Sequence, residues 1–519
     1  MRLSVLSDWL GQRLERGNGQ PIYRQLHLAL QEAMSSRELP PGTRLPSSRL
    51  LAEELGVARN TVTQVYEQLC LEGYATSFTG RGTFVADSAP GNFPRGAASN
   101  GKTATKPNAA LARTDVIEPP ILSARGGRLI SGAGVSKFQS GAFMPGVPDV
   151  SKFPSRVWNR LNSKYWRRPR PDLLTYAAGG GHGPLRLALT EYLRTSRSVQ
   201  CTPEQIIITT GIHQSVDLAV RLLSDPGDVI WTEDPCYWGI KSVLQISGLQ
   251  PRAIAVDEEG ICPTPADLAA TPKLILVTPS HQYPLGAVMS LARRRMLLEY
   301  ARQTGCWIIE DDYDSEYRYS GRPLASLQGL DTSGKVIYVG SFGKTLYPGL
   351  RVGYVVVPEI LAESFATASA ELYREGQLLQ QAVLAEFIAE GHFTSHIRRM
   401  RAVYSRRREL LLQAIAKRYG NALQVTGEDA GLHLVISFPK GIDDREIADS
   451  ALQRNIVARP LSAYFSDSLH GASGLLLGYA CVPDEDIEKC FTELSASIDE
   501  QLQRRVVSMA LTDPERLAG

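Results

Sequence analysis

An apolar run leads into a lysine in the segment Val336-Ile337-Tyr338-Val339-Gly340-Ser341-Phe342-Gly343-Lys344-Thr345-Leu346. Further continuous apolar runs, separated by stretches long enough for helices, are Ile206-Ile207-Ile208, Val229-Ile230-Trp231, Leu274-Ile275-Leu276-Val277 and Trp307-Ile308-Ile309. Runs that are continuous rather than alternating are typical of strands buried on both faces. The pattern predicts an α/β fold with a mostly parallel sheet.

Polar residues of one chemical set follow two of these runs. A lysine that can form a Schiff base, an acid for a pyridinium nitrogen, and phosphate-binding Ser and Arg are what pyridoxal 5'-phosphate (PLP) requires. Lys344 would form the Schiff base, and Asp311 would keep the pyridinium nitrogen protonated. Tyr313 would hydrogen-bond the phenolate oxygen, while Ser341 and Arg351 would bind the phosphate.

A second phosphate contact is expected at the start of a helix. Gly211 follows the run Ile206–Thr210, and Ile212 opens the segment that leads into Gln214-Ser215-Val216-Asp217-Leu218. Backbone amides at a helix N-terminus suit a phosphate group.

Residues 1–86 have a different pattern, which predicts helices followed by a two-stranded wing. Pro21 opens a helix with Ile22, Leu26, Leu30 and Ala33 on one face. Ser47 or Ser48 caps a second helix with an apolar face of Leu50, Leu51 and Leu55, and a third runs from about Ala58 to Leu71. The segments Tyr74–Phe78 and Gly82–Val85 flank a Thr-Gly-Arg-Gly turn.

The third helix is the candidate reader of double-stranded DNA. Arg59, Asn60 and Thr61 lie at its N-terminus, where Arg can read guanine and Asn can read adenine. Around the second helix, Arg44, Ser47 and Arg49 are placed to contact phosphates. At the wing tip, Arg81 could enter the minor groove.

Composition and charge set the class of protein. The formal net charge is +2, with nine Arg and Lys against eight Asp and Glu in residues 1–86, so DNA binding must rest on a local surface. The seven cysteines are scattered, which favours a reducing cytoplasm over a disulfide or zinc framework. No apolar run is long enough to span a membrane, and no metal site is expected.

The pattern divides the chain into four parts. Residues 1–86 form the winged helix, 87–137 a flexible linker rich in Ala, Gly, Pro and Ser, 138–505 the α/β domain, and 506–519 a tail. The linker carries several basic residues, which could contact the phosphates of the DNA backbone or remain solvated.

Two motif sets carry a resemblance. The segments Pro21–Leu26, Pro41–Arg49, Arg59–Val62 and Gly80–Val85 resemble the winged helix of GntR-type regulators. The segments Thr278–Gly286 and Glu310–Tyr319 resemble fold-type-I aminotransferases, and together the chain resembles the MocR subfamily of GntR regulators. The resemblance implies that Tyr237 stacks on the PLP ring. It also implies a homodimer whose two winged helices read two operator half-sites.

The sequence departs from the family pattern near the substrate end. Gly343 replaces a usual Ser, and Tyr176–Gly181 replaces a Tyr-Gly-Asp-Pro-like turn. The segment Leu475–Tyr479 lacks the arginine by which aminotransferases hold a carboxylate, and Ala463 stands where relatives have arginine. Arg459 is a candidate substitute for binding an effector.

Three functions therefore remain open. The leading hypothesis is a PLP-dependent transcriptional regulator that senses an amine or amino-acid effector. The alternatives are a regulator that senses PLP itself, and an active aminotransferase that also binds DNA. A basic run of Arg398, Arg399, Arg401, Arg406, Arg407 and Arg408 on a helix is either a solvated face or an accessory phosphate surface.

Overall fold

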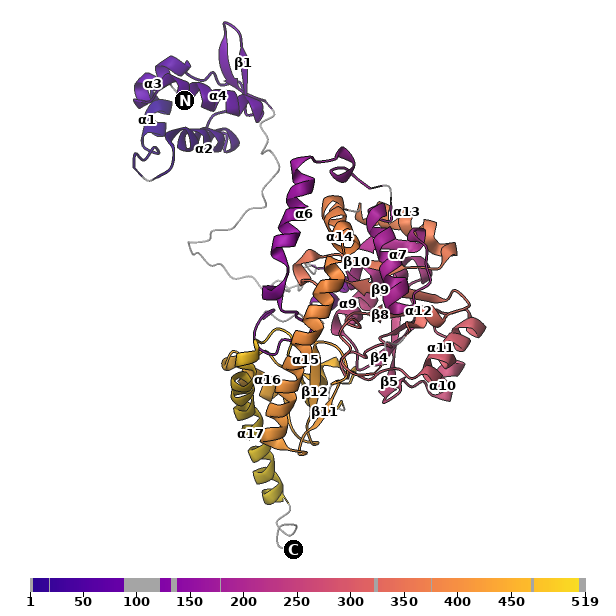
Figure 1. The fold of residues 1–519 in the computed structure, drawn as a ribbon. Coiled ribbons are helices and arrows are strands. Elements are labelled where there is room, and N and C mark those ends of the chain that lie inside the picture. The colour runs from indigo at the N-terminus through magenta and orange to yellow at the C-terminus, as the bar shows by residue number, and fades with distance from the viewer. Residues whose placement is uncertain are drawn as a thin grey trace, which may run out of the picture. The chain divides into compact units, whose positions relative to one another are not determined.

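The computed structural model describes residues 3–17, 19–87, 122–131, 138–177, 179–321, 325–374, 376–467 and 471–512. The chain divides into two compact units, Met1–Ile117 and Glu118–Gly519 (Figure 1). No helix in these described ranges is both long and apolar enough to cross a membrane.

The first unit is a small winged-helix fold. Its elements are α1 Leu3–Gly11, α2 Ile22–Ser35, α3 Ser48–Leu55, α4 Arg59–Leu71, β1 Ala75–Phe78 and β2 Gly82–Val85. The predicted helices and wing are confirmed, and Ser47 is the N-cap of α3, accepting from the Leu50 amide at 3.2 Å. Two predicted core positions differ, because Leu50 is exposed and Ile22 is only half-buried.

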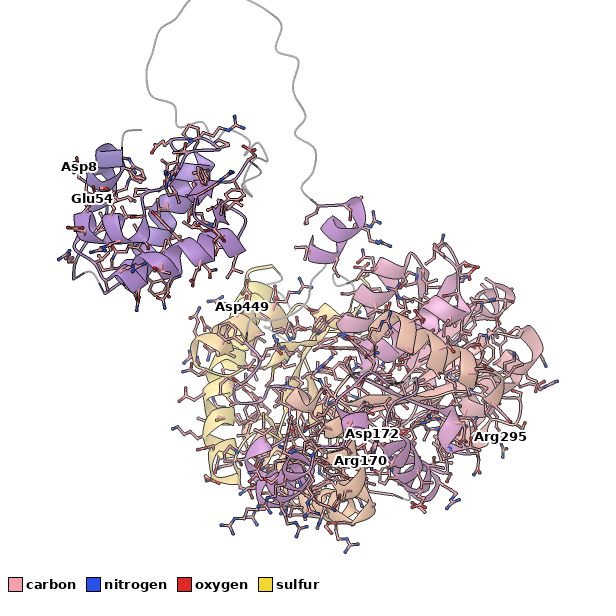
Figure 2. All side chains as sticks on the ribbon, turned by 90° about the horizontal axis from the view of Figure 1, so that it is seen from above. Asp8, Glu54, Arg170, Asp172, Arg295 and Asp449 are labelled. Atoms are coloured by element: carbon pink, nitrogen blue, oxygen red, sulfur yellow. The ribbon has the colours of Figure 1, made fainter. Side chains whose placement is uncertain are left out.

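Helix α1 was not expected from the sequence. Leu6 and Leu10 are buried in the same core as α2, α3 and α4. Figure 2 labels Asp8 on α1 and Glu54 on α3, and the Ser7 hydroxyl donates a hydrogen bond to Glu54. Among the described side chains, Leu6 and Leu10 lie in this core and Trp9 packs against it, and a helix of nine residues has too few turns for its apolar spacing to stand out in the sequence.

The second unit is built on a mixed sheet with strand order β3-β10-β9-β8-β7-β4-β5-β6. The strands are β3 Ile206–Thr209, β4 Val229–Asp234, β5 Gln250–Asp257, β6 Gly260–Ile261, β7 Leu274–Val277, β8 Trp307–Asp312, β9 Val336–Ser341 and β10 Gly353–Val356. Neighbours from β9 to β5 pair in parallel, and β10 runs antiparallel to both β3 and β9. The expected mostly parallel sheet is confirmed, and β10 was missed.

Both faces of this sheet are covered by helices, as continuous apolar strands require. Ile309 packs on one side with residues of α8, α9 and α13, while its neighbour Ile308 packs on the other side with residues of α11 and α12. The helices of this unit are α5 Ala124–Ser131, α6 Ser155–Arg167, α7 Gly183–Arg197, α8 Ile212–Leu223, α9 Trp238–Ser247, α10 Pro265–Ala269, α11 Leu291–Thr304, α12 Leu327–Leu330, α13 Ala362–Tyr373, α14 Leu378–Ala389, α15 His392–Tyr419, α16 Asp444–Gln453 and α17 Ile487–Thr512.

A smaller sheet near the C-terminus completes the unit. Its strand order is β11-β12-β14-β13, from β11 Gln424–Thr426, β12 His433–Ser437, β13 Arg459–Pro460 and β14 Gly474–Gly478. The long helix α15 lies beside this sheet in Figure 1 and contacts α17.

The predicted linker lies largely outside the described residues. Residues 88–121 and 132–137 belong to that part, while Ala124–Ser131 between them forms α5, which contacts α9. The predicted tail begins inside α17, because that helix continues to Thr512.

Candidate functional site

The sheet brings the predicted PLP residues to one edge. Because β3, β9 and β8 point the same way, their carboxyl ends meet, and ligands of open α/β sheets bind at that edge. Gly211 follows β3, Ser341 is the last residue of β9, and Asp311 is the second-last residue of β8. The antiparallel strand β10 starts at the same edge with Gly353, two residues after Arg351.

Lys344 lies just beyond the end of β9. Its Nζ donates a hydrogen bond of 2.7 Å to the Gly146 carbonyl. A Cβ at position 146 would lie 2.7 Å from this Nζ, so a side chain there would displace the end of the lysine side chain. Burial lowers the pKa of Lys344, opposed by the carboxylates of Asp314 and Asp311. A lower pKa favours the uncharged amine, which is the nucleophilic form.

The Asp311 side chain is half-buried near the end of β8. Burial, together with Asp312 and Asp314, raises the pKa of Asp311 to about 8. Within the described ranges, no group donates a hydrogen bond to its carboxylate, and Lys344 is the charge that lowers this pKa. A cationic N–H facing the carboxylate would stabilise its ionised form. The site therefore fits the pyridinium nitrogen of PLP.

The phosphate end of the site forms around Gly211. This residue has a φ of 125° and caps α8, whose first amides, starting at Ile212, have no acceptor inside the helix. A Cβ on Gly211 would lie 4.0 Å from Nη1 of Arg351, which itself has a φ of 51°. Arg351 also lines a cavity of about 90 Å³ with Thr210 and Gln214. Ser341 pairs with Gly353 on the neighbouring strand, close to this cavity.

Several aromatic side chains surround the candidate PLP site. Tyr237 caps α9 and stacks on His213, with ring centroids 5.8 Å apart and planes at 25°. The Tyr283 ring meets Tyr237 at 5.9 Å and Tyr313 at 5.6 Å, nearly perpendicular to both. The hydroxyls of Tyr283 and Tyr464 lie 3.3 Å apart. Nothing local in the sequence indicates that Tyr283 and Tyr464 meet, because they are 181 positions apart.

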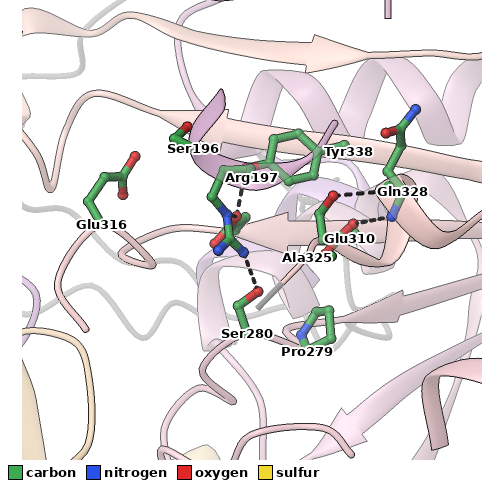
Figure 3. A network of polar contacts seen from close by, with 12 residues as sticks. Ser196, Arg197, Pro279, Ser280, Glu310, Glu316, Ala325, Gln328 and Tyr338 are labelled. Atoms are coloured by element: carbon green, nitrogen blue, oxygen red, sulfur yellow. Dashed lines mark hydrogen bonds and ion pairs between the residues drawn. The ribbon is translucent and has the colours of Figure 1, made fainter. Parts of the chain in front are cut away.

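A buried ion pair between α7 and β8 fixes the carboxyl end of β8. Arg197 at the end of α7 donates from Nε to Asp312 Oδ2 at 2.7 Å and from Nη2 to Ser280 Oγ at 2.6 Å (Figure 3). The Tyr338 hydroxyl donates to the same Asp312 oxygen at 2.6 Å. Asp312 and Asp311 are adjacent and point to opposite faces of β8. The pair therefore fixes the strand end that carries Asp311.

The candidate effector residue Arg459 lies on β13. Its Nη2 donates to the Phe138 carbonyl at 3.0 Å and contacts the Met144 sulfur at 3.4 Å. It lines a cavity of about 340 Å³ together with Arg445 and Ala463. Met144 is two residues before Gly146, so Arg459 and Lys344 contact the same short segment. Strand β14, where aminotransferases carry the carboxylate-binding arginine, is apolar and fully buried.

The basic run on α15 is largely engaged within its own unit. Arg407 bonds Asp149 and Asp484 at 2.8 and 2.9 Å, and Arg406 pairs with Asp484 at 2.8 Å. Bonds to backbone carbonyls are made by Arg399 to Lys152, Arg401 to Glu316 and Arg408 to Glu428. These contacts favour a structural role over an accessory phosphate surface.

The predicted DNA-contacting residues lie on the exposed side of the winged helix. Arg59 is the first residue of α4, and Arg59 and Asn60 are exposed while Thr61 is half-buried. Arg49 in the first turn of α3 and Arg81 at the wing tip are exposed. Arg44 forms an isolated bridge with Phe84, and its guanidinium lies against Gly82, so it is held beside the wing.

Comparisons with known proteins agree with both units. The profile of aminotransferase class I and II matches residues 149–494, and that of the bacterial regulatory proteins of the gntR family matches residues 22–85. The probable rhizopine catabolism regulatory protein MocR of Rhizobium meliloti is 37% identical over 487 residues, covering 93% of this chain and 95% of that protein. The HTH-type transcriptional regulator TauR of Rhodobacter capsulatus is 30% identical, covering 90% of this chain and 95% of that protein.

Solved structures match the second unit. The multiple substrate aminotransferase of Thermococcus profundus has a TM-score of 0.65 at 25% identity, covering 74% of this chain and 98% of that chain. The alpha-aminoadipate aminotransferase LysN of Thermus thermophilus has a TM-score of 0.63 at 27% identity, with 74% and 96% covered. The chain therefore belongs to the MocR-type GntR transcriptional regulators, in which a winged helix-turn-helix domain precedes an aminotransferase class I and II domain.

Proposed function

We propose that this regulator binds operator DNA through its winged helix and that its aminotransferase-like domain binds PLP to modulate DNA binding. The observation that carries the proposal is the placement of Lys344 and the half-buried Asp311 carboxylate at the same carboxyl edge of the sheet, where each acts on the charge of the other. Since a regulator must reach chromosomal DNA, we place it in the cytoplasm.

Each site residue has a role toward PLP in this proposal. Lys344 binds it covalently, Asp311 holds its ring nitrogen, and Tyr313 donates to its phenolic oxygen. Ser341, Arg351 and the amides of Gly211 and Ile212 hold the phosphate, and Tyr237 covers the ring face. When bound, PLP supplies an aldehyde carbon that the amine of Lys344 or of an effector can attack.

The effector of this proposal is an amine or amino acid. Its amino group would exchange with Lys344, and an acidic group would bind Arg459 or the adjacent cavity wall. The names of two relatives refer to different small molecules. MocR of Rhizobium meliloti is named for rhizopine catabolism, and PdxR of Corynebacterium glutamicum is named for pyridoxine biosynthesis. The second name favours the variant in which PLP itself is the effector.

An active aminotransferase is the second candidate, supported by the match to enzymes of this fold. The apolar, buried β14 argues against it, because no arginine there holds a substrate carboxylate. Steady-state transamination of amino acids with keto acids separates the two. We expect no sustained turnover, and turnover at ordinary enzyme rates would favour the enzyme.

A homodimer completes the proposal. On the second unit, Tyr176 is 78% exposed and Trp166 is 57% exposed. Contiguous exposed apolar patches mark interaction sites, and these two side chains are candidates for such a patch in this proposal. A second copy covering them would also bring two winged helices to one operator.

Two measurements test the proposal. Borohydride reduction of PLP-treated protein should attach the cofactor to Lys344 in the wild type and fail in Lys344→Ala. DNase footprinting upstream of the neighbouring genes should then show two protected half-sites. A visible absorbance band that persists unchanged in Lys344→Ala would contradict the cofactor site, and the lack of any protected site would contradict the DNA-binding function.

A further inference from the structure

A histidine and an aspartate without an assigned role lie directly behind Tyr313. His281, in the loop after β7, has its Nδ1 2.8 Å from the Tyr313 hydroxyl oxygen. The same Nδ1 is 3.1 and 3.2 Å from the two oxygens of Asp314. Side chains of His281 and Asp314 are almost fully buried, at 1% and 2% exposure. One ring nitrogen thus lies within hydrogen-bond distance of three oxygens, one from Tyr313 and two from Asp314.

The carboxylate determines which atom carries the proton. An ionised Asp accepts hydrogen bonds and donates none, and a neutral imidazole nitrogen is either a donor or an acceptor. The Nδ1 that faces Asp314 is therefore stabilised with its proton in place. Because Nδ1–H also points to Tyr313, the phenol oxygen becomes an acceptor there. The proton of the Tyr313 hydroxyl is then free to be donated in another direction.

Close packing prevents the imidazole from turning over. A Cβ at Gly431 would lie 2.2 Å from His281 Cε1 and 2.5 Å from Asp314 Oδ2. A Cβ at Gly286 would lie 3.1 Å from His281 Nε2. The ring also stacks on Tyr313 with planes at 30°. With both of its edges enclosed, His281 cannot exchange its two nitrogens.

The other titratable neighbours leave this proton arrangement unchanged. His433 on β12 has its ring 5.3 Å from His281, and burial, then the neighbouring His281, lowers the pKa of His433 to about 4, so His433 is neutral at pH 7. Burial raises the pKa of Tyr313, and Asp314, Tyr283, Asp311 and Glu233 raise it further. Tyr313 therefore keeps its hydroxyl proton.

We propose that His281 and Asp314 are positioning residues that commit Tyr313 to donate its hydroxyl proton toward the phenolic oxygen of bound PLP. The inference rests on the proposed use of PLP. The positioning role is a separate requirement, because PLP could bind whether the Tyr313 hydroxyl donates its proton to the cofactor or to His281.

The test compares Tyr313→Phe, Asp314→Asn and their double variant with the wild type. The readouts are the dissociation constant for PLP and the pH midpoint of the visible absorbance of the loaded protein. A hydroxyl donor stabilises the ionised phenolic oxygen, so Tyr313→Phe should weaken PLP binding about tenfold and move the midpoint to higher pH. Asp314→Asn should move the midpoint the same way with the Tyr313 hydroxyl present. The double variant should shift no further than Tyr313→Phe.

Two further variants separate positioning from folding. His281→Asn keeps a donor near the Nδ1 position and should retain the wild-type midpoint, whereas His281→Phe should reproduce Tyr313→Phe. Asp444→Asn is the matched control, since this equally buried carboxylate accepts from Ser462 and Gly474. It should lower thermal stability without moving the midpoint.

The outcomes distinguish this inference from the proposed function. If the wild type binds PLP on Lys344 but Asp314→Asn leaves the midpoint unchanged, or its shift adds fully to that of Tyr313→Phe, the positioning role is overturned alone. If the wild type forms no adduct with PLP, both are overturned.

Discussion

At the scale of single residues, the site contains ionisable groups whose charged form is destabilised in the protein without a ligand. The Asp311 carboxyl group lies half-buried near the end of β8, where desolvation raises its pKa to about 8. Residues with strongly perturbed pKa values in a cleft mark functional sites. Asp311 is thus better explained by a ligand than by the packing of β8.

The Asp311 carboxylate yields a prediction for Asp311→Asn. Since the folded pKa is raised above the unfolded value, the stabilising contribution is complete at low pH and is lost as pH rises from about 4 through about 8. The cofactor-free Asp311→Asn protein should therefore lose less stability than the wild type between pH 5 and pH 8. It should also bind PLP about tenfold or more weakly, because the ring nitrogen loses its charged partner.

Thermal unfolding across pH and a PLP titration check both effects. Asp444→Asn serves again as the control for a buried carboxylate with hydrogen-bond donors of its own. Asp311 would be shown to be purely structural if its variant kept wild-type PLP affinity.

At the scale of elements, the placement of β8 depends on residues distant in sequence. Arg197 and Asp312 are 115 positions apart, and their ion pair joins α7 to β8. Removing one partner of a buried pair leaves an uncompensated charge. Arg197→Met should therefore cost about 3 kcal/mol of the free energy of unfolding and also weaken PLP binding.

Chemical denaturation measures that cost. The surface arginine Arg170, paired with Asp172 as labelled in Figure 2, is the matched control, and Arg170→Met should change neither stability nor PLP affinity. The double variant Arg197→Met/Asp312→Leu should recover part of the loss. A loss for Arg197→Met no larger than that for Arg170→Met would refute the anchoring role.

The winged helix separates base contacts from phosphate contacts. Arg59 opens α4 and should reach base edges, so Arg59→Ala should cost about 1–3 kcal/mol on operator DNA and relax specificity. Arg44 lies beside the wing and should meet phosphate, so Arg44→Ala should weaken all sequences and lower the salt slope by about one unit.

Binding of operator and scrambled DNA across a salt series tests both substitutions. If Arg59→Ala weakens the two DNAs equally, α4 does not read bases. If neither variant changes binding, this domain is not the DNA reader.

The sequence predicted elements that have a local pattern and missed those that depend on distant partners. Continuous apolar runs located β3, β4, β7, β8 and β9, because burial on both faces leaves a compositional mark. Strand β10 has the same local mark in Gly353–Val356 and was nonetheless missed, whereas its antiparallel pairing with β3 and β9 could not be predicted because it joins distant segments. Lys344 and Asp311 could be predicted from their chemistry. Gly146 and Arg197 could not, because their contacts join segments far apart in the chain.

At the scale of the whole molecule, the account requires two copies. The protein of 56.8 kDa should sediment as a dimer at micromolar concentration with PLP. Replacing the exposed Trp166 by a charged residue, as in Trp166→Glu, should weaken the dimer by about tenfold or more. Wild-type protein that sediments only as a monomer would contradict the dimer.

The coupling of PLP to DNA binding is the central claim, and one titration tests it most directly. Operator affinity is measured for the wild type and Lys344→Ala, each with and without PLP. We predict that PLP changes the wild-type dissociation constant by about 5–150-fold and leaves that of Lys344→Ala unchanged. Equal operator affinity of the cofactor-free and PLP-loaded wild type would contradict the claim, as would an equal PLP response in Lys344→Ala.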